Sequence, residues 1–260
     1  MGLLEGKKAL ITGVANDRSI AYGIAKSFRR EGAELAFTYA GEKLRKRVEE
    51  IAKELGSDVV VKCDVSVDED IKSLRKHLEE SWGELDIIVH SIAYAPREEF
   101  RKGVVDTTRN GFKVALDVSV YSLIALTREL LPLMEGKEGS IITLSYYGAE
   151  KVVPHYNIMG IAKAALECTV RYLAYDIAPY GHRINAISAG PVKTLAAYSI
   201  TGFHILMEHT TKVNPFGKPI TIDDIGDTAV FLCSEWARGI TGEVVHVDNG
   251  YHIMGVFGKK

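Results

Sequence analysis

The chain alternates short apolar runs with longer helical patterns, and this alternation restricts its fold more than any other feature. Some runs, for example Ile87-Ile88-Val89, are apolar at every position, as is typical of strands that helices cover on both faces. Alternating strands and helices predict a parallel sheet with right-handed crossover connections. We expect strands over Lys8–Thr12, Glu34–Thr38, Val59–Cys63, Leu85–Ser91, Ser140–Ser145, Arg183–Ser188 and Glu243–Val247.

Three helical patterns stop at a glycine, the residue that most readily adopts the left-handed conformation of a helix C-terminus. No repeat, low-complexity tract or linker interrupts the alternation. The sequence therefore predicts one α/β domain of the Rossmann type over residues 1–260, doubly wound around a parallel sheet of about seven strands. The three helices are expected over Ile20–Glu31, Glu42–Leu55 and Val67–Trp82, before Gly32, Gly56 and Gly83.

The composition excludes several classes of protein. The net charge is -2, so no excess of positive charge predicts binding to nucleic acid or to a membrane surface. No stretch reaches the roughly 18 apolar residues of a membrane helix. The cysteines, Cys63, Cys168 and Cys233, are widely spaced and form no Cys-x-x-Cys motif. These features predict a reduced, cytoplasmic protein without a disulfide framework or a metal site.

Two segments are longer than ordinary connections, Tyr94–Val105 and Gly190–Asn214. Both follow expected strands, and open parallel sheets bind their ligands outside the carboxyl ends of the strands. Long loops at that edge usually form the walls or the lid of a site. The apolar middle of the second segment, Leu195–Met207, is therefore expected to be a substrate lid with a short helix.

A dinucleotide site is indicated where the first strand ends. Gly13 lets the backbone approach a pyrophosphate, and the helix starting at Ile20 offers free N–H groups and the positive end of its dipole. We expect Ser19 to cap this helix and to donate its hydroxyl to a phosphate oxygen. Only Gly13 and Gly23 occupy suitable places in a Gly-x-Gly-x-x-Gly motif, so a glycine turn before a capped helix remains an alternative.

The ends of the second and third strands indicate which dinucleotide binds. The second strand ends in Tyr39-Ala40-Gly41, without the acid that often holds the adenosine ribose and without a basic residue to pair with a 2′-phosphate. This pattern favours NADH over NADPH. After the third strand, Asp64 is expected to accept from the adenine amino group and Val65 to pack on the ring. Alternatively, Asp64 and Ser66 cap the next helix.

Tyr156 and Lys163 are the candidate catalytic residues. They are seven residues apart, so they would share a face of one helix that runs to about Tyr180. A lysine beneath a tyrosine supplies positive charge, which favours hydrogen bonding from the phenol to a developing oxyanion. The lysine can also hold ribose hydroxyls of the cofactor. A core tyrosine and a surface lysine remain the alternative at this spacing.

Tyr147 and Lys151 form a second pair, with the Tyr-x-x-x-Lys spacing of ordinary short-chain carbonyl reductases. They precede Pro154, which favours an extended predecessor and a helix start. This pair is therefore not expected to share a helix face.

Four segments carry a family resemblance: Ser91–Pro96, Leu144–Tyr146, Tyr156–Lys163 and Asn185–Ala197. They resemble the bacterial enoyl-acyl-carrier-protein reductases of the short-chain dehydrogenase/reductase superfamily. The likeness extends through Gly242–Asp248 and covers nearly the whole chain. Tyr-x6-Lys combined with Ser-Ala-Gly-Pro is specific to that family.

The resemblance implies that NADH reduces the 2,3 double bond of an enoyl thioester in fatty-acid elongation. Tyr156 would stabilise the enolate formed as hydride adds to the β-carbon, Lys163 would bind the nicotinamide ribose, and Tyr146 would be a second active-site tyrosine. Tyr94 and Ala95 would contact the substrate, together with Tyr146 and Tyr156. The implied cofactor contacts are Gly13, Ser19, Ile20, Ala40, Asp64, Val65, Ser91, Ile92, Lys163, Val192, Lys193, Thr194, Leu195 and Ala196.

The resemblance also implies a homotetramer and an acyl-carrier protein as partner. Carrier proteins are acidic, and the lid helix of the family commonly presents basic residues to them. Here those places hold Thr201, His204 and Ile205, so the docking surface departs from the family pattern, and Lys193, Lys212 or His209 are alternative contributors. Ala40 also departs, because a polar cofactor contact is often found there.

Other functions need other features. A 3-oxoacyl thioester reductase would need the Tyr147–Lys151 pair at the nicotinamide, and a non-catalytic nucleotide sensor would be expected to lack a usable tyrosine–lysine pair. His204, Glu208 and His209 lack the His-Glu-x-x-His spacing of a zinc site, and no nucleophile elbow supports a hydrolase.

Overall fold

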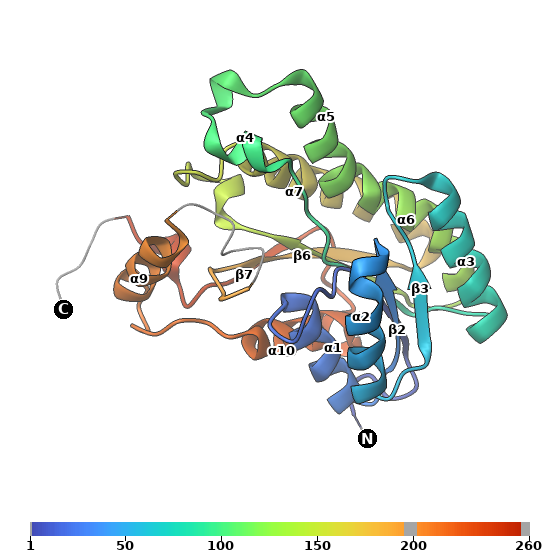
Figure 1. The fold of residues 1–260 in the computed structure, drawn as a ribbon. Helices are drawn as coiled ribbons and strands as arrows, with labels where there is room; N and C mark the ends of the chain where they lie inside the picture. Colours follow the sequence, from blue (N-terminus) through green and yellow to red (C-terminus); the bar gives the residue numbers. More distant parts are fainter. Residues whose placement is uncertain (1, 195–201, 256–260) are drawn as a thin grey trace.

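The computed structural model describes residues 2–194 and 202–255 (Figure 1). In this part of the chain, seven parallel strands form one sheet in the order β3-β2-β1-β4-β5-β6-β7, which confirms the predicted doubly wound architecture. Their bounds differ from the expected ones by at most two residues at either end. The strands are β1 (Lys8–Ile11), β2 (Glu34–Tyr39), β3 (Val59–Lys62), β4 (Ile87–His90), β5 (Ser140–Ser145), β6 (Arg183–Ala189) and β7 (Val244–Val247).

Helices pack on both faces of the sheet (Figure 1). The α-helices among the described residues are α1 (Ile20–Arg30), α2 (Glu42–Glu54), α3 (Asp68–Trp82), α4 (Arg97–Arg101), α5 (Arg109–Leu116), α6 (Ser122–Leu130), α7 (Ile158–Ile177), α9 (Phe203–Val213) and α10 (Ile222–Cys233). One apolar layer joins α1, α2 and α10 to the sheet, and a second joins α3, α6 and α7 to its other face. None of these helices is both long and apolar enough to cross a bilayer.

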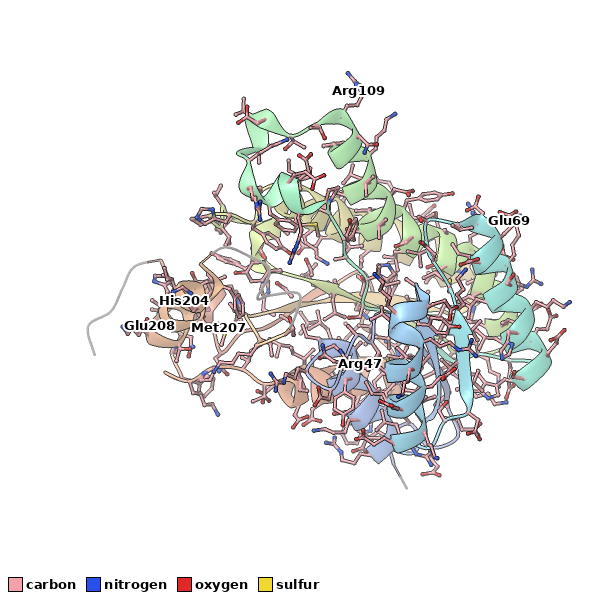
Figure 2. The ribbon with its side chains drawn as sticks, viewed as in Figure 1. Arg47, Glu69, Arg109, His204, Met207 and Glu208 are labelled. Atoms are coloured by element: carbon pink, nitrogen blue, oxygen red, sulfur yellow. The ribbon has the colours of Figure 1, made fainter. Side chains whose placement is uncertain are left out.

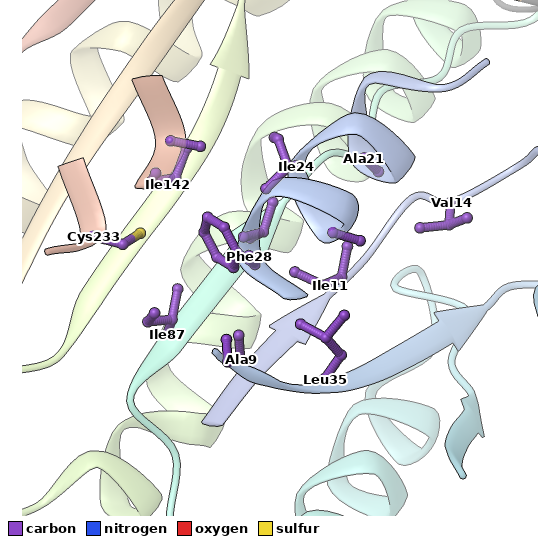
Figure 3. Packing of buried hydrophobic residues seen from close by; sticks show 14 of the residues in the cluster. Ala9, Ile11, Val14, Ala21, Ile24, Phe28, Leu35, Ile87, Ile142 and Cys233 are labelled. Atoms are coloured by element: carbon purple, nitrogen blue, oxygen red, sulfur yellow. The ribbon is translucent and has the colours of Figure 1, made fainter. Parts of the chain in front are cut away.

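The first apolar layer is centred on α1 (Figure 3). Phe28 and Ile24 of this helix are fully buried against Ile11, Ile87 and Ile142 of three neighbouring strands. Replacing a buried phenylalanine such as this one by alanine typically costs about 3–5 kcal/mol. The layer therefore fixes α1, and with it the turn that precedes the helix.

Glycines act as the sequence indicates at three helix ends and differently at one other place. Gly32, Gly56 and Gly83 have φ values of +92°, +71° and +69°, as predicted for helix C-termini. Gly23, in contrast, lets α10 approach α1, since a Cβ atom there would lie 2.6 Å from the Cβ atom of Ile222. Gly23 therefore serves helix packing.

Both long segments lie at the carboxyl edge of the sheet. The first contains α4 and a short 3-10 turn, Val104–Asp106, and α5 follows it. The second contains α9, the expected short helix, while residues 195–201 lie outside the described part. A π-helical turn, Asp117–Tyr121, joins α5 to α6. Such turns are frequent near functional sites.

Candidate active site

A cavity of about 480 Å³ lies where the carboxyl ends of β1, β4, β5 and β6 meet α9. Both long segments supply its walls, with Arg97 and Phe100 from the first and Val192 and Phe203 from the second. The structure thus brings together most of the residues that the sequence indicated. Those that line the cavity are Gly13, Ser19, Ile20, Ser91, Ile92, Tyr94, Ala95, Tyr146, Tyr156, Lys163, Val192 and Thr194.

Tyr156 is not part of a helix, so the prediction that it shares a helical face with the lysine is wrong. It lies in the turn before α7, between His155 at φ +66° and Asn157 at φ +46°. Positive φ values are costly for residues other than glycine, so such a turn needs support from its surroundings. The side-chain amide of Asn157 supplies it by donating to the carbonyl oxygens of Phe100 (3.1 Å) and Lys102 (2.6 Å).

Close packing fixes the ring of Tyr156. The ring of Tyr146 meets it edge-on, with centroids 4.9 Å apart and planes at 73°. Gly148 lies directly against the ring, because a Cβ atom there would be 2.5 Å from the Cδ1 atom of Tyr156. Gly160, in the first turn of α7, lets the helix approach Gly148, since a Cβ atom there would lie 2.8 Å from the Gly148 carbonyl oxygen. The phenol is therefore held by an aromatic edge and by Gly148.

Both phenols keep their protons at neutral pH. Burial, with a smaller effect of Tyr146, raises the pKa of Tyr156 well above its ordinary value, and burial also raises the pKa of Tyr146. The two hydroxyls are therefore hydrogen-bond donors. The Tyr146 hydroxyl is buried and has no hydrogen-bond partner among the described residues, so a ligand or a water molecule has to satisfy it.

Lys163 projects from α7 beneath the cavity and is only 5% exposed. Its Nζ atom donates to the carbonyl oxygen of Leu144 at 2.5 Å. Burial lowers the pKa of Lys163 to about 8, and Glu167 opposes this shift.

Two buried polar groups lie close enough to Lys163 to interact with its charge. Glu167, one turn after Lys163 in α7, accepts a hydrogen bond of 2.5 Å from the Ser145 hydroxyl at the end of β5. His90 bridges β5 and α6 through Thr143 (2.9 Å) and Ser122 (2.8 Å). Burial and the nearby Lys163 lower the pKa of His90 to about 3, so this imidazole is neutral.

The turn after β1 borders the cavity and requires a glycine. Gly13 has φ +80°, and a Cβ atom there would lie 1.9 Å from the carbonyl oxygen of Ser91, so only glycine fits. Ser19 is the N-cap of α1, as predicted, and accepts from the amide of Tyr22 at 3.3 Å. The Ser19 hydroxyl donates to the carbonyl oxygen of Asn16 (2.7 Å), so donation to a phosphate would require it to change partner.

Four predicted cofactor contacts do not line the cavity: Ala40, Asp64, Val65 and Lys193. Ala40 is exposed after β2, and Asp64 follows β3, so both lie at the same edge of the sheet on the far side of β1. Asp64 does not cap α3, whose N-cap is Val67; its carboxylate accepts from the amide and the hydroxyl of Ser66 in the preceding turn. Leu195 and Ala196 lie outside the described residues, as does Thr201.

The second tyrosine–lysine pair has no place at the cavity. The Tyr147 ring packs edge-on against Tyr251, with centroids 5.6 Å apart, and Lys151 is exposed. On the lid helix, Glu208 pairs with Lys212 at 2.6 Å. No group of three or more potential metal ligands occurs within residues 2–194 and 202–255.

Several residues of the site were missed by sequence reasoning. Glu167 could have been found, because it follows Lys163 by four residues and so lies on the same helical face. Asn157, Gly148 and His90 give no such signal. Their partners are distant in sequence or depend on a turn whose conformation no periodicity reveals.

The chain is similar to known proteins over nearly its whole length. A family model described as enoyl-(acyl carrier protein) reductase matches residues 13–252. The enoyl-(acyl-carrier-protein) reductase (NADH) of Aquifex aeolicus is 84% identical over 260 residues, which cover 100% of this chain and 96% of the relative. Its crystal structure superimposes with a TM-score of 0.97 over 98% of this chain and 100% of that one.

A second solved structure contains a dinucleotide. The reductase from Anaplasma phagocytophilum, in complex with NAD, is 46% identical and has a TM-score of 0.94, covering 99% of this chain and 96% of that chain. The family match spans most of the sequence, and its relatives share both the strand order and the length. The chain belongs to the enoyl-(acyl carrier protein) reductases of the short-chain dehydrogenase/reductase superfamily.

Proposed function

We propose that this enzyme uses NADH to reduce the 2,3 double bond of enoyl thioesters carried by acyl-carrier protein, with Tyr156 stabilising the enolate. NADH-dependent enoyl reduction in fatty-acid synthesis is the activity of the family. The observation that carries the residue roles is the cavity itself. It unites a protonated phenol, a buried lysine and a glycine turn at one sheet edge.

The described residues fit a dinucleotide. Gly13, Ser19 and Ile20 line the cavity, so the N-terminus of α1 offers its free N–H groups to a phosphate there. When bound, NADH supplies the hydride that adds to the β-carbon. Gly13, Ser19 and Ile20 would hold its pyrophosphate, and Ser91, Ile92, Val192 and Thr194 its nicotinamide half. Ala40, Asp64 and Val65 would lie along its adenosine half, on the far side of β1.

Tyr156 would donate a hydrogen bond to the thioester oxygen. Negative charge develops on that oxygen as the β-carbon accepts hydride, and a donor that is stronger in the transition state than in the ground state accelerates the step. The raised pKa keeps the proton on the phenol, so Tyr156 acts as a donor rather than as an anion. In carbonyl reduction the oxygen is on the carbon that accepts hydride, whereas here it is two carbons away. A tyrosine placed in the turn before α7 suits that displacement.

Lys163 would hold the nicotinamide ribose. Its ammonium group has three N–H donors, of which one is used by Leu144, so two remain for ribose hydroxyls. The charge is retained at neutral pH because the pKa, although lowered, stays at about 8. Leu195, Ala196 and Lys193 would complete the cofactor contacts from the segment after β6.

Tyr146, Tyr94 and Ala95 would contact the acyl thioester. The unpartnered Tyr146 hydroxyl is available to the substrate, and the backbone of Tyr94 is fixed by Ser119 of the π-helical turn. The Ser119 hydroxyl accepts from the amide of Tyr94 at 3.0 Å and lies 3.1 Å from its carbonyl oxygen. Ala95 is buried beside it.

A direct assay tests the function. Loss of NADH absorbance is followed with a crotonyl thioester and, separately, with an acetoacetyl thioester. We expect turnover of the crotonyl substrate. Turnover of only the acetoacetyl substrate would instead support a 3-oxoacyl reductase, and NADH binding without turnover of either substrate would support a nucleotide sensor.

We also propose that the enzyme is a homotetramer, that it works in the cytoplasm, and that residues 1–260 act as one unit. Exposed aromatic residues on one helical layer support self-association: Tyr172 and Tyr175 of α7 are 72% and 81% exposed, and Tyr121 is 41% exposed. Large exposed apolar groups that cluster commonly mark protein interfaces. Light scattering coupled to size-exclusion chromatography tests this assignment, since a mass of one chain would contradict it.

A further inference from the structure

One rim of the cavity carries unusual positive charge. Residues 97–113, here called the α4 rim, contain five basic side chains and three acidic ones, a net charge of +2 in a chain whose total is -2. Arg97 lines the cavity, so the rim borders its mouth. The rim projects from the body beyond α7, and Arg109 stands at its outer end (Figures 1 and 2). The basic residues are Arg97, Arg101, Lys102, Arg109 and Lys113.

In the described part of the chain, Arg97, Arg101, Arg109 and Lys113 form no salt bridge, whereas Lys102 lies near enough to Glu99 for its charge to help lower the pKa of that carboxyl. Most other surface ion pairs are local, for example Arg45 with Glu49 and Lys72 with Glu69. Of the acids in the rim, Glu99 is buried, accepts from Thr108 at 2.7 Å and interacts with Lys102, whereas Glu98 and Asp106 are exposed, so the rim keeps its net charge of +2. Unpaired charge at a rim attracts a partner of opposite charge.

The rim is also apolar at its tip and is fixed in place. Val105 is 93% exposed and Val104 is 48% exposed, between Arg101 and Arg109 in the chain. Asn157 ties the other end of the segment to the turn that holds Tyr156. An interface combines apolar contacts with a charged border, and a fixed surface loses less entropy on binding.

The lid helix does not offer such a surface. Its lysine, Lys212, forms an ion pair with Glu208. Ile205 is 62% exposed, and the residue before it is a histidine rather than an arginine or a lysine. Figure 2 shows His204 and Glu208 on the outer side of α9. The two rims of the cavity therefore differ in unpaired charge.

We propose that the acidic acyl-carrier protein docks on the α4 rim, with Arg101, Lys102, Arg109 and Lys113 around Val104 and Val105, rather than on α9. This inference rests on the proposed function, because it assumes a carrier-bound substrate. The carrier then stands beside Arg97 at the cavity mouth, and its thioester arm enters between α4 and α9.

The test compares two crotonyl thioesters, one on acyl-carrier protein and one on N-acetylcysteamine, which is neutral and has no carrier. The triple variant Arg101→Glu/Arg109→Glu/Lys113→Glu should raise KM for the carrier substrate about 10-fold or more at low salt, with less difference at high salt. Its kcat and KM for the N-acetylcysteamine substrate should stay within about twofold of the wild type. The control Lys53→Glu/Lys76→Glu/Arg238→Glu changes the charge equally at exposed sites outside the rim.

Other results overturn the inference. An unchanged KM for the carrier substrate would refute it, and a rise caused instead by His204→Glu/Lys212→Glu would assign docking to α9. If the triple variant loses activity toward both substrates, the milder Arg109→Ala/Lys113→Ala variant is tested instead. Its affinity for acyl-carrier protein, measured by fluorescence anisotropy, should be weaker than that of the wild type, and an unchanged affinity would refute the inference. Failure of the proposed function is distinct, because the wild type would then reduce neither crotonyl substrate.

Discussion

Gly148 is expected to control the position of the Tyr156 phenol, and Gly148→Ala tests this. An alanine Cβ atom would lie 2.5 Å from Cδ1 and 2.9 Å from Cε1 of Tyr156, where ordinary contacts are 3.4–4 Å. The ring would therefore have to move by about 1 Å. Gly148 does not have a positive φ, so the alanine backbone itself is unstrained.

The size of the effect follows from this displacement. A misplacement of about 1 Å in an active site costs about 100-fold in rate, which is about 2.7 kcal/mol in activation free energy. The new methyl group would also lie 3.2 Å from Cδ1 of Tyr146, so a shift of the Tyr156 ring toward Tyr146 is restricted. We expect kcat toward crotonyl N-acetylcysteamine to fall about 100-fold, while the Kd for NADH, measured by nucleotide fluorescence, stays unchanged.

Gly239→Ala is the matched control. No heavy atom lies within 4 Å of its Cβ position, so this variant should keep wild-type activity and thermal stability. In a Gly148→Ala background, the further change Tyr156→Phe should cost little, because the phenol is already misplaced. A Gly148→Ala enzyme with kcat within about threefold of the wild type would refute the view that this glycine positions the ring.

Three further outcomes follow from the same geometry. Tyr156→Phe should lower kcat about 100-fold and spare the Kd for NADH, whereas Lys163→Ala should raise that Kd; equal effects of both on NADH binding would contradict separate roles. Because burial lowers the pKa of Lys163 to about 8, its positive charge is present below that pH and is lost above it, so NADH affinity should decline as pH rises through about 8. Glu167→Gln removes the carboxylate that raises this pKa and should move the decline to lower pH, and an unmoved profile of KM for NADH would speak against the coupling. Asn157→Ala and Asn157→Gly should both lower kcat, but only the alanine variant keeps the backbone strain and should lose thermal stability; wild-type kcat in both would show that the amide does not position Tyr156.

The fold was predictable from the sequence because the required signals are local. A strand covered on both faces, such as Ile87–His90, has to be apolar throughout, and a helix that ends in a left-handed residue favours glycine, as at Gly83. Right-handed crossovers leave few topologies open, but they do not by themselves fix the strand order, which came from the structure. Helix ends were less certain where a cap has no side-chain bond, as at Val67.

The lining of the cavity was partly predictable for the same reason. Residues that follow parallel strands meet at one edge, so Gly13, Ser91 and Tyr146 could be grouped without coordinates. The conformation of the turn at Tyr156 could not, because helical periodicity assumes that the helix has already begun. Positive φ values at His155 and Asn157 depend on the distant carbonyl groups of Phe100 and Lys102, which no local pattern encodes.

The division of labour between Tyr156 and Lys163 follows from where each side chain makes its contacts. Had both residues occupied one helix, seven positions would have separated them by about 10.5 Å along its axis, with the charge acting on the phenol from below. Instead, the turn supports Tyr156 from the α4 segment and Gly148, and Lys163 is bound to Leu144 at the end of β5. The phenol is tuned by burial and by Tyr146, whereas the lysine is tuned by burial and by Glu167. The two groups therefore have separate supports. In the proposed mechanism, this arrangement lets Tyr156 reach a carbonyl that is distant from the nicotinamide while Lys163 keeps its position at the ribose.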